Sequence, residues 1–590
     1  MRLNLATGLL LTVPLTAVQA SRSVPRQVPP SGLEAVGSTQ DFFLRTLLTE
    51  SADYGNLTSC RNSTGPFKVG IVGAGAAGLY SAILLQSLGI DYEILELTER
   101  IGGRIYTYRF DETAWNNSKP GEPDYYNYYD VGAMRFPGMP WMDRVIGTQN
   151  TSIVSYVNSH VTEEADKIRM IPYIFQANNT FRLFNDKLIL NQETPSAQNF
   201  GVLTSEGGDI PAGTFSTLSP GQVFDEAISD LIAALEADFD TGFNKLMEYD
   251  QLSVRQYLLN RNFTGPEIEW IETINDATGH YDDMSLSQAA LEQWIFDSAP
   301  LSSWQAVDGG MDRMTYGMTK ILKNSVITSK RVTAIRPGAG TSLDVVINGT
   351  EVRNYAHVIN TVPLGVMQMM DLTELKLDYT KRLAIRKLSY DPAGKIGMTF
   401  KSRWWESLTL PFVGGQSFSD LPIRRCVYPS YGLNTTDAAG AMIASYTWGQ
   451  DSSRLGAYYE APESRAHIIN ATLRELARMN NVTEDFLNEQ FVEAHLYNWY
   501  AHEASIGAFA LFSPGQFSTL MPALLQPAAD GKLHFAGEAL SSGHAWIIGA
   551  LNSAYRSVAE VLAVESRSDL LTQLVQTWGE IDEVDMGWYS

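Results

Sequence analysis

Three glycines near residue 75 have the spacing of a turn that binds phosphates. The run Gly73-Ala-Gly75-Ala-Ala-Gly78 follows a short apolar segment, 67–72, and precedes apolar residues at helical spacing over 76–88. Gly73 allows a tight turn, Gly75 lets the backbone approach a pyrophosphate, and Gly78 lets the helix pack closely on the strand. Free N–H groups at the start of that helix attract phosphate charge. The motif predicts a dinucleotide site.

A second strand and an acid complete this unit. The helical pattern stops at Gly89, a common residue at helix ends, and the run DYEILE over 91–96 follows. Glu96 ends that run eighteen positions after Gly78, where an acid binds ribose hydroxyls. Strand, helix and strand therefore form a βαβ unit that suits NAD or FAD.

The next turn, Arg100-Ile-Gly-Gly-Arg104-Ile-Tyr-Thr107, favours FAD. Its two glycines and Arg104 bring a guanidinium to the diphosphate from a second side. The turn resembles the flavin amine oxidase superfamily, whose signature there is LE…R-x-GGR-x-x-T/S. Since no second GxGxxG follows a strand, a separate nicotinamide domain is not expected. For reoxidation of the flavin, O2 is the expected acceptor.

The C-terminal region extends the resemblance. Residues 535–538 (FAGE) and 543–550 (GHAWIIGA) resemble the closing motif of the superfamily, and Val332 matches a position whose backbone meets adenine. The resemblance implies that Glu538 contacts the ribityl-phosphate part of FAD and that the following helix points its N-terminus at the flavin. Residues 499–517 lack the cysteine that binds FAD covalently in monoamine oxidases, so noncovalent FAD is expected. Motif and resemblance together give the cofactor-binding set Gly73, Gly75, Ala76, Ala77, Gly78, Glu96, Arg104, Met134, Arg135, Val332, Glu538, Trp546 and Ile547.

Arg135 indicates the substrate class. The run Asp130-Val-Gly-Ala-Met-Arg135-Phe-Pro137 is similar to the G-x-M-R-x-P of L-amino acid oxidases in that superfamily, where the arginine holds the substrate α-carboxylate. The same resemblance implies that Lys395 holds a water against flavin N5. It also implies that Tyr428, within one residue of register, shares the carboxylate with Arg135. Arg135, Lys395 and Tyr428 are the expected catalytic residues.

Other substrate contacts follow from the same resemblance. The carbonyl of Ala545 is expected to accept from the substrate amine, while Trp546 and Trp448 are expected to line the pocket. The implied reaction transfers a hydride from Cα to flavin N5; the imino acid is hydrolysed to a 2-oxo acid and ammonia, and O2 gives hydrogen peroxide. The side-chain preference stays open. Large apolar or aromatic side chains are favoured by Trp294, Phe296, Trp448 and Trp546, whereas L-lysine is favoured by Glu292 or Asp297.

Two rival functions remain open at the level of the sequence. One is a polyamine or monoamine oxidase of the same superfamily, against which Arg135 argues. The other is a non-catalytic secreted binding protein that keeps the flavin fold. Two histidines near the expected site, His502 and His544, have no evident partner in the sequence and are interpreted as structural.

The expected fold class is α/β with α+β elements in several domains. It comprises a discontinuous Rossmann-like FAD-binding domain, a mixed-sheet substrate-binding domain and an inserted helical domain. The FAD-binding domain is assigned to 67–115, 301–370 and 525–565, the substrate-binding domain to 116–150 and 371–524, and the helical domain to 151–300. Residues 1–20 are assigned to a signal peptide, and 21–66 to a pro-segment and N-terminal arm.

Export is predicted from the N-terminus and the sequons. Arg2, the mostly apolar run 9–18 and the small residue Ala20 have the pattern of a secretory signal, so the expected location is extracellular. The chain also carries ten Asn-X-Ser/Thr sequons: Asn56, Asn62, Asn116, Asn150, Asn178, Asn262, Asn348, Asn434, Asn470 and Asn481.

The composition of the chain argues against several classes of binding partner. The formal charge of −23 repels nucleic acid, and two cysteines without zinc-type spacing support neither a disulfide framework nor a metal site. No run after the signal is apolar for about 18 residues, so no membrane association is expected after cleavage. The expected partners are a small L-amino acid, O2 and a second copy in a homodimer or higher homo-oligomer.

Overall fold

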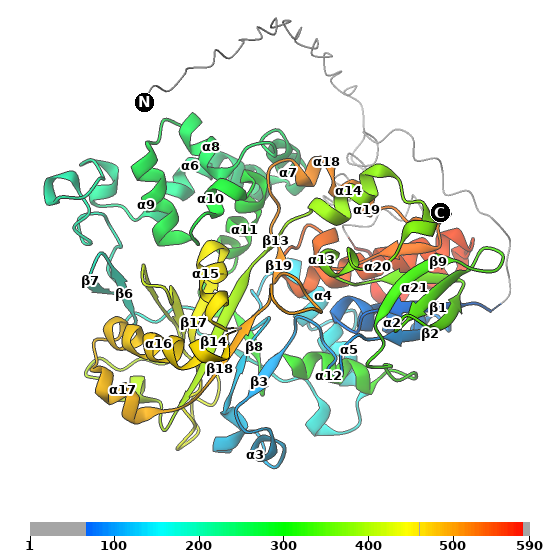
Figure 1. The fold of residues 1–590 in the computed structure, drawn as a ribbon, viewed down its shortest axis with the longest axis horizontal. Coiled ribbons are helices and arrows are strands. Elements are labelled where there is room, and N and C mark those ends of the chain that lie inside the picture. Colours follow the sequence, from blue (N-terminus) through cyan, green and yellow to red (C-terminus); the bar gives the residue numbers. More distant parts are fainter. Residues whose placement is uncertain (1–65, 460, 582–590) are drawn as a thin grey trace, which may run out of the picture. The chain divides into compact units, whose positions relative to one another are not determined.

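The computed structural model describes residues 66–459 and 461–581. In it the glycine turn follows the carboxyl end of an inner strand of a four-stranded parallel sheet. The strand order is β2-β1-β12-β20, and three distant parts of the chain contribute strands to it (Figure 1). This confirms the α/β fold class and a discontinuous nucleotide domain. The strand bounds are β1 Lys68–Val72, β2 Asp91–Leu95, β12 His357–Asn360 and β20 Leu533–Phe535.

Two long helices pack against each other and against this sheet. They are α2 (Ala76–Ser87) and α20 (Ile547–Val564), and their buried residues belong to one core with β1. Gly78 permits the close contact, because a Cβ there would lie 2.0 Å from the carbonyl oxygen of Gly73. Although α20 is long and apolar enough to cross a membrane, 94% of it is buried inside the protein. It is therefore a core helix.

A second, seven-stranded sheet has the order β18-β14-β17-β16-β15-β6-β7. Every residue of its inner strand β14 is buried. The sheet is mixed, because β15 and β6 pair in parallel whereas the other neighbours are antiparallel. The bounds are β6 Phe181–Phe184, β7 Lys187–Leu190, β14 Ala393–Phe400, β15 Gln416–Ser419, β16 Arg425–Val427, β17 Met442–Trp448 and β18 Phe491–Asn498.

The prediction of a helical domain over 151–300 is wrong for the strands between α5 (Ile153–His160) and α6. Strands β6 and β7 form a hairpin through Asn185 and Asp186, both in the left-handed region (φ 48° and 56°), and join the seven-stranded sheet. Strand β5 (Met170–Pro172) pairs with β8 (Gln305–Val307). The helical part begins later, with α6 Pro220–Ala237, α7 Phe239–Met247, α8 Val254–Asn260, α9 Gly265–Asn275, α10 His280–Asp283 and α11 Leu286–Ser298.

Candidate active site

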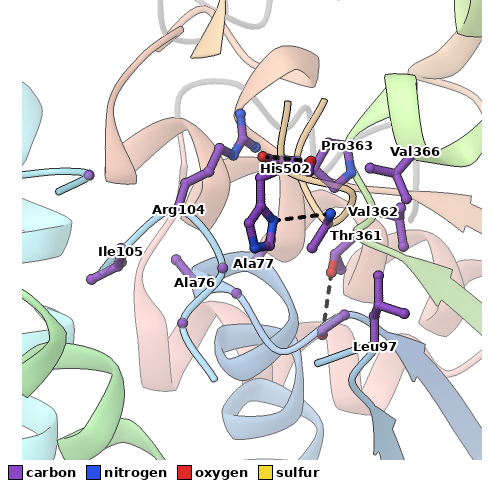
Figure 2. Close-up of a pocket in the computed structure, with 18 of the residues that line it drawn as sticks. Ala76, Ala77, Leu97, Arg104, Ile105, Thr361, Val362, Pro363, Val366 and His502 are labelled. Carbon is purple, nitrogen blue, oxygen red and sulfur yellow. Dashed lines mark hydrogen bonds between the residues drawn. The ribbon is translucent and has the colours of Figure 1, made fainter. Parts of the chain in front are cut away.

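A cavity of about 260 Å³ lies at the carboxyl ends of β1, β2 and β12. Its lining includes the glycine turn and the Gly102–Arg104 turn, and Figure 2 shows Arg104, Thr361 and His502 around the start of α2. Of the predicted cofactor residues, the lining includes Gly73, Gly75, Ala76, Ala77, Glu96, Arg104, Val332, Glu538, Trp546 and Ile547. Gly78 lies behind the turn, and Met134 and Arg135 lie in a neighbouring cavity.

The shape and polarity of this cavity fit FAD. Helix α2 starts without a side-chain cap and without an acid in its first turn, so its N–H groups are available to phosphate. A Cβ on Gly75 would meet nothing nearer than 3.9 Å, which leaves the front of the turn open. Glu96, at the end of β2, accepts hydrogen bonds from the backbone of Ala74 and Thr98 at 2.9 Å each.

Sequence reasoning missed the loop after β12. Thr361, Val362 and Pro363 line the cofactor cavity, and the Thr361 hydroxyl donates to the carbonyl of Val72 at 2.9 Å. The available signal was their position directly after a buried parallel strand, because ligands bind at such strand ends.

The carboxylate of Glu538 connects the cofactor cavity to the backbone around it. Arg104 Nη1 donates to Oε1 at 2.7 Å, and the backbone N–H of Ala510 donates to the same oxygen at 3.1 Å. The N–H of Ala545 donates to Oε2 at 3.0 Å. Glu538 is 6% exposed, so these bonds form in a low-dielectric environment and hold three segments in fixed positions.

A second cavity, of about 450 Å³, adjoins the first. The two cavities share seven lining residues, which places a small molecule in the second cavity next to a cofactor in the first. The shared residues are Gly132, Ala133, Tyr446, Phe509, Ala545, Trp546 and Ile547. We refer to the second cavity as the substrate cavity.

Arg135 projects into the substrate cavity inside an aromatic cage. Its guanidinium lies 4.8 Å from the ring centre of Phe175, 5.6 Å from that of Trp304 and 5.8 Å from that of Phe296. Nη1 donates to the hydroxyl of Tyr173 at 3.3 Å. Within residues 66–459 and 461–581 no ion pair includes Arg135, although it is only 8% exposed. A buried guanidinium of this kind favours an anionic ligand.

Lys395 lines the cofactor cavity and contacts Gly132 and Met134, which border the substrate cavity. Its Nζ donates to the carbonyls of Asp130 and Gly132 at 2.9 and 2.8 Å and lies 3.7 Å from the sulfur of Met134. Burial lowers its pKa to about 7, an effect that Asp130 opposes and Arg135 reinforces. Burial also raises the pKa of Asp130 to about 6. At neutral pH the amine can therefore both hold and release a proton.

The prediction that Tyr428 shares a carboxylate with Arg135 is wrong. Tyr428 points away from the substrate cavity into the core on the opposite face of the sheet. Its hydroxyl donates to Asn480 Oδ1 and accepts from Cys426 Sγ at 3.3 Å. Side chains alternate along a strand, so Arg425 and Val427 face the cavity side, and a shift of one residue supplies no hydroxyl there.

The remaining predicted substrate contacts line the cavity, with one exception. Trp448, Ala545 and Trp546 all border it, and so do Glu292, Phe296 and Asp297 from α11. Trp294 does not, because it packs on Phe239 in the helical core, with ring centres 5.2 Å apart. The residues bordering the cavity that sequence reasoning missed include Phe175, His280, Trp304 and Arg425.

The two histidines interpreted as structural lie in different places: His544 is buried, whereas His502 is half-buried and borders the cofactor cavity. His544 bonds Gln288 at 2.8 Å and packs against Phe512 and Phe517. Burial lowers its pKa to about 4, so it is neutral at pH 7. His502 accepts from the backbone N–H of Ala504 and stacks on Tyr497.

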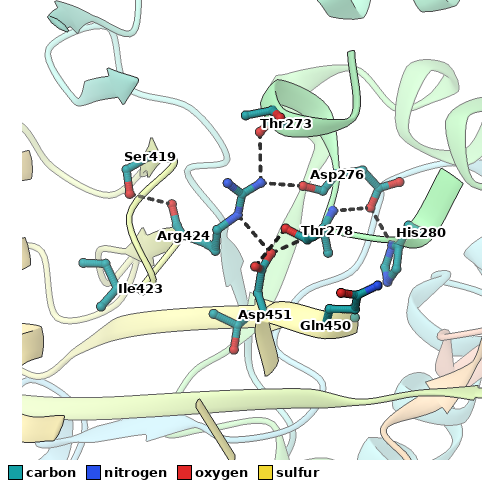
Figure 3. Close-up of polar contacts among 12 residues, drawn as sticks. Thr273, Asp276, Thr278, His280, Ser419, Ile423, Arg424, Gln450 and Asp451 are labelled. Carbon is teal, nitrogen blue, oxygen red and sulfur yellow. Dashed lines mark hydrogen bonds and ion pairs between the residues drawn. The ribbon is translucent and has the colours of Figure 1, made fainter. Parts of the chain in front are cut away.

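A polar network supports the wall opposite the cofactor (Figure 3). His280 bonds Asp276 at 2.6 Å and Asp391 at 2.9 Å. Burial opposes the charged imidazole, but the two carboxylates outweigh it and raise the pKa of His280 well above its usual value. Arg424 donates to the carbonyls of Thr273 and Asp276 at 2.9 and 2.7 Å. The network fixes the start of α10 against the seven-stranded sheet.

This arrangement, a dinucleotide cavity joined to a smaller cavity with a caged arginine, has a match among known families. Residues 76–562 match the family of flavin-containing amine oxidoreductases. The chain belongs to this family. As a flavin amine oxidoreductase it uses FAD, and the cofactor cavity is its flavin site.

Individual relatives cover most of the chain. A Dictyostelium discoideum protein named as a bifunctional amine oxidase is 37% identical over 97% of this chain, which spans 54% of that relative's length. L-amino-acid oxidase 4 of Hebeloma cylindrosporum is 36% identical over 89% of this chain and 86% of the relative. The solved structure of a putrescine oxidase bound to putrescine has a TM-score of 0.62 and 16% identity, covering 85% of this chain and 99% of that one. The structural likeness shows the fold.

Proposed function

We propose that this flavin amine oxidoreductase is an L-amino acid oxidase. It converts an L-amino acid, O2 and water into a 2-oxo acid, ammonia and hydrogen peroxide. The observation that carries the proposal is Arg135, a buried guanidinium without an acidic partner in the described chain that borders the cavity next to the flavin site. A simple amine has no carboxylate to neutralise it, whereas every amino acid does. The relatives named as L-amino-acid oxidases support the same activity.

The residues of the chain bind and orient the substrate. Arg135 binds the α-carboxylate, and the aromatic rings around it exclude water and strengthen that ion pair. The carbonyl of Ala545 accepts from the substrate amine; the left-handed conformation of this residue (φ 64°) and its N–H bond to Glu538 fix its direction. Together these contacts direct the Cα–H bond toward the flavin cavity. Such positioning lowers a barrier by about 7–11 kcal/mol.

Proton movement is assigned to Lys395. With a pKa of about 7 its amine holds a water at the junction of the cavities and exchanges a proton with it. The chemistry that FAD supplies when bound is acceptance of a hydride from Cα and transfer of both electrons to O2. Hydrolysis of the resulting imine completes the reaction in water.

A peroxide assay with the purified flavoprotein tests the proposal. We expect peroxide release with L-amino acids, and none with D-amino acids, putrescine or benzylamine. Oxidation of putrescine or benzylamine, but not of any L-amino acid, would make the chain an amine oxidase instead.

We also propose that the protein is secreted and glycosylated. The signal peptide and two sequons, Asn56 and Asn62, lie outside the described residues. The asparagines of the other eight sequons are all exposed, as glycosylation requires. A loss of mass on treatment of the culture-medium protein with an endoglycosidase is the expected result. That the protein forms a homodimer or a higher homo-oligomer also stays a prediction.

A further inference from the structure

A row of side chains crosses the seven-stranded sheet beside the substrate cavity and continues into the cofactor cavity. The strand register places Lys395, Tyr446, Arg425 and Phe418 next to one another on four successive strands. Cations and rings alternate along the row: Lys395 Nζ lies 4.5 Å from the ring centre of Tyr446, and the Arg425 guanidinium lies 5.0 Å from that of Phe418. Arg425 also lies 4.7 Å from the ring of Trp448. Arg425, Tyr446, Phe418 and Trp448 all border the cavity.

Arg425 is the second guanidinium in this cavity that has no acidic partner. Among the described residues, 66–459 and 461–581, no ion pair includes it. Burial lowers its pKa to about 10; the nearby positive charge of Arg135 adds to this effect, whereas Tyr446 and the more distant charge of Asp276 oppose it. The adjacent Arg424 is different, because its Nε pairs with Asp451 at 3.2 Å and its Nη2 binds two carbonyls (Figure 3). Arg424 is therefore structural, whereas Arg425 remains available to a ligand.

None of the acids that border the cavity forms an ion pair with Arg425 in the described part of the chain. Asp276 is bonded to His280, whose protonated ring also binds Asp391. Asp297 accepts two hydrogen bonds from Gln293, at 3.1 and 3.0 Å. Burial, together with the charge of Asp276, raises the pKa of Glu292 to about 8, so this carboxyl is mostly protonated at neutral pH. After a substrate α-carboxylate has neutralised Arg135, Arg425 is therefore the guanidinium bordering the cavity that still has no ion-pair partner among the described residues.

We propose that Arg425 binds the side-chain carboxylate of an acidic L-amino acid such as L-glutamate. This inference rests on the proposed amino acid oxidase function and assigns its substrate class. The rings of Phe418 and Trp448 cover the guanidinium of Arg425 and limit its contact with water, which strengthens an ion pair there. The protonated carboxyl of Glu292 can donate to the same anion. L-Lysine would instead bring its side-chain ammonium beside Arg425, which has no ion-pair partner among the described residues.

The test compares kcat/KM for L-glutamate, L-methionine and L-lysine in the wild-type holoenzyme, R425Q and R425E. We expect L-glutamate to be a better substrate than L-lysine for the wild type. R425Q is expected to lower kcat/KM for L-glutamate about 10- to 100-fold, the range of a lost charge-assisted hydrogen bond, and to change L-methionine less than about 3-fold. R425E is expected to reverse the order of L-glutamate and L-lysine.

A matched control and a binding measurement accompany the kinetics. Arg182 pairs with Phe418 on the next strand, binds Asn191 at 2.8 Å and does not border the cavity, so R182Q is expected to leave the ratio of L-glutamate to L-methionine unchanged. Glutarate is expected to bind the oxidised wild-type enzyme at least about 10-fold more tightly than pentanoate by calorimetry, and R425Q is expected to remove this difference.

Three results would overturn the inference. They are a wild-type preference for L-lysine over L-glutamate, an equal loss of all substrates in R425Q, and equal binding of glutarate and pentanoate. If L-methionine is oxidised in any of these cases, the amino acid oxidase function stands and only the assignment of Arg425 fails. If no L-amino acid is oxidised by the wild type, both fail.

Discussion

Arg104 and Glu538, 434 residues apart in the sequence, form an ion pair of 2.7 Å at the wall of the flavin cavity. The pair joins the turn after β2 to the segment before α20. Glu538 also accepts hydrogen bonds from the N–H groups of Ala510 and Ala545. One carboxylate therefore holds the wall of the cofactor cavity and also Ala545, whose carbonyl we assign to binding the substrate amine.

Glu538→Gln is expected to weaken flavin binding. The amide keeps the size but loses the charge, and the bonds to a buried charged group are worth about 1.5–3 kcal/mol each. The ratio of flavin absorbance to protein absorbance after gel filtration should fall. Asp569→Asn, which removes an exposed ion pair with Arg567, should leave that ratio unchanged. Full retention of flavin by the Glu538 variant would contradict the role given to this carboxylate.

Two glycine variants distinguish cofactor contact from packing. Gly78→Ala should prevent correct folding, because the added Cβ would lie 2.0 Å from a backbone oxygen of Gly73. Gly75→Ala should fold, since its Cβ meets nothing nearer than 3.9 Å, but should bind flavin weakly because the methyl group occupies the phosphate position. Thermal unfolding and flavin content measured on both variants check this. A Gly75 variant with normal flavin content would show that the diphosphate does not approach this turn.

Arg135→Met is expected to lower kcat/KM for every L-amino acid by at least about 100-fold, since a bidentate charge-assisted pair is lost from a buried position. Arg135→Lys keeps the charge but not the planar fork, so an intermediate loss is expected. Stopped-flow measurement of flavin reduction separates substrate affinity from the rate of the chemical step. Unchanged kinetics in the methionine variant would remove the carboxylate-binding role of Arg135.

Lys395→Met is expected to slow flavin reduction about 100-fold or more, in the range of a lost acid–base group. With a folded-state pKa of about 7, the amine of Lys395 is protonated below that pH and neutral above it. The rate in the wild type should therefore change with an inflection near pH 7, and the variant should lack this inflection. Lys187→Met, which removes an exposed lysine, serves as the control. An identical pH profile in wild type and Lys395→Met would contradict the proton role.

Local patterns predicted the βαβ unit almost to the residue. The expected segments 67–72, 76–88 and 91–96 correspond to β1, α2 and β2, because glycine turns and apolar runs set these boundaries locally. The final helix after Trp546 was also predicted correctly.

The sequence did not show which face of the seven-stranded sheet each side chain occupies. Tyr428 was assigned to the cavity, but a strand presents alternate residues to opposite faces, and an error of one position reverses the assignment. Cys426, an apolar-type residue in the buried core, was the signal that Arg425 faces the other side. The hairpin around Asn185 is local and was missed within the segment assigned to helices. Its place in the seven-stranded sheet was beyond any local pattern, because the neighbouring strand β15 lies more than 200 residues later.

Anaerobic addition of L-amino acids to the oxidised holoprotein tests the central claim most directly. The flavin absorbance should bleach with L-enantiomers, return when O2 is admitted, and persist with D-enantiomers, putrescine and benzylamine. Bleaching by an amine that lacks a carboxylate, with none by any L-amino acid, would contradict the account, since Arg135 would then have no substrate carboxylate to bind.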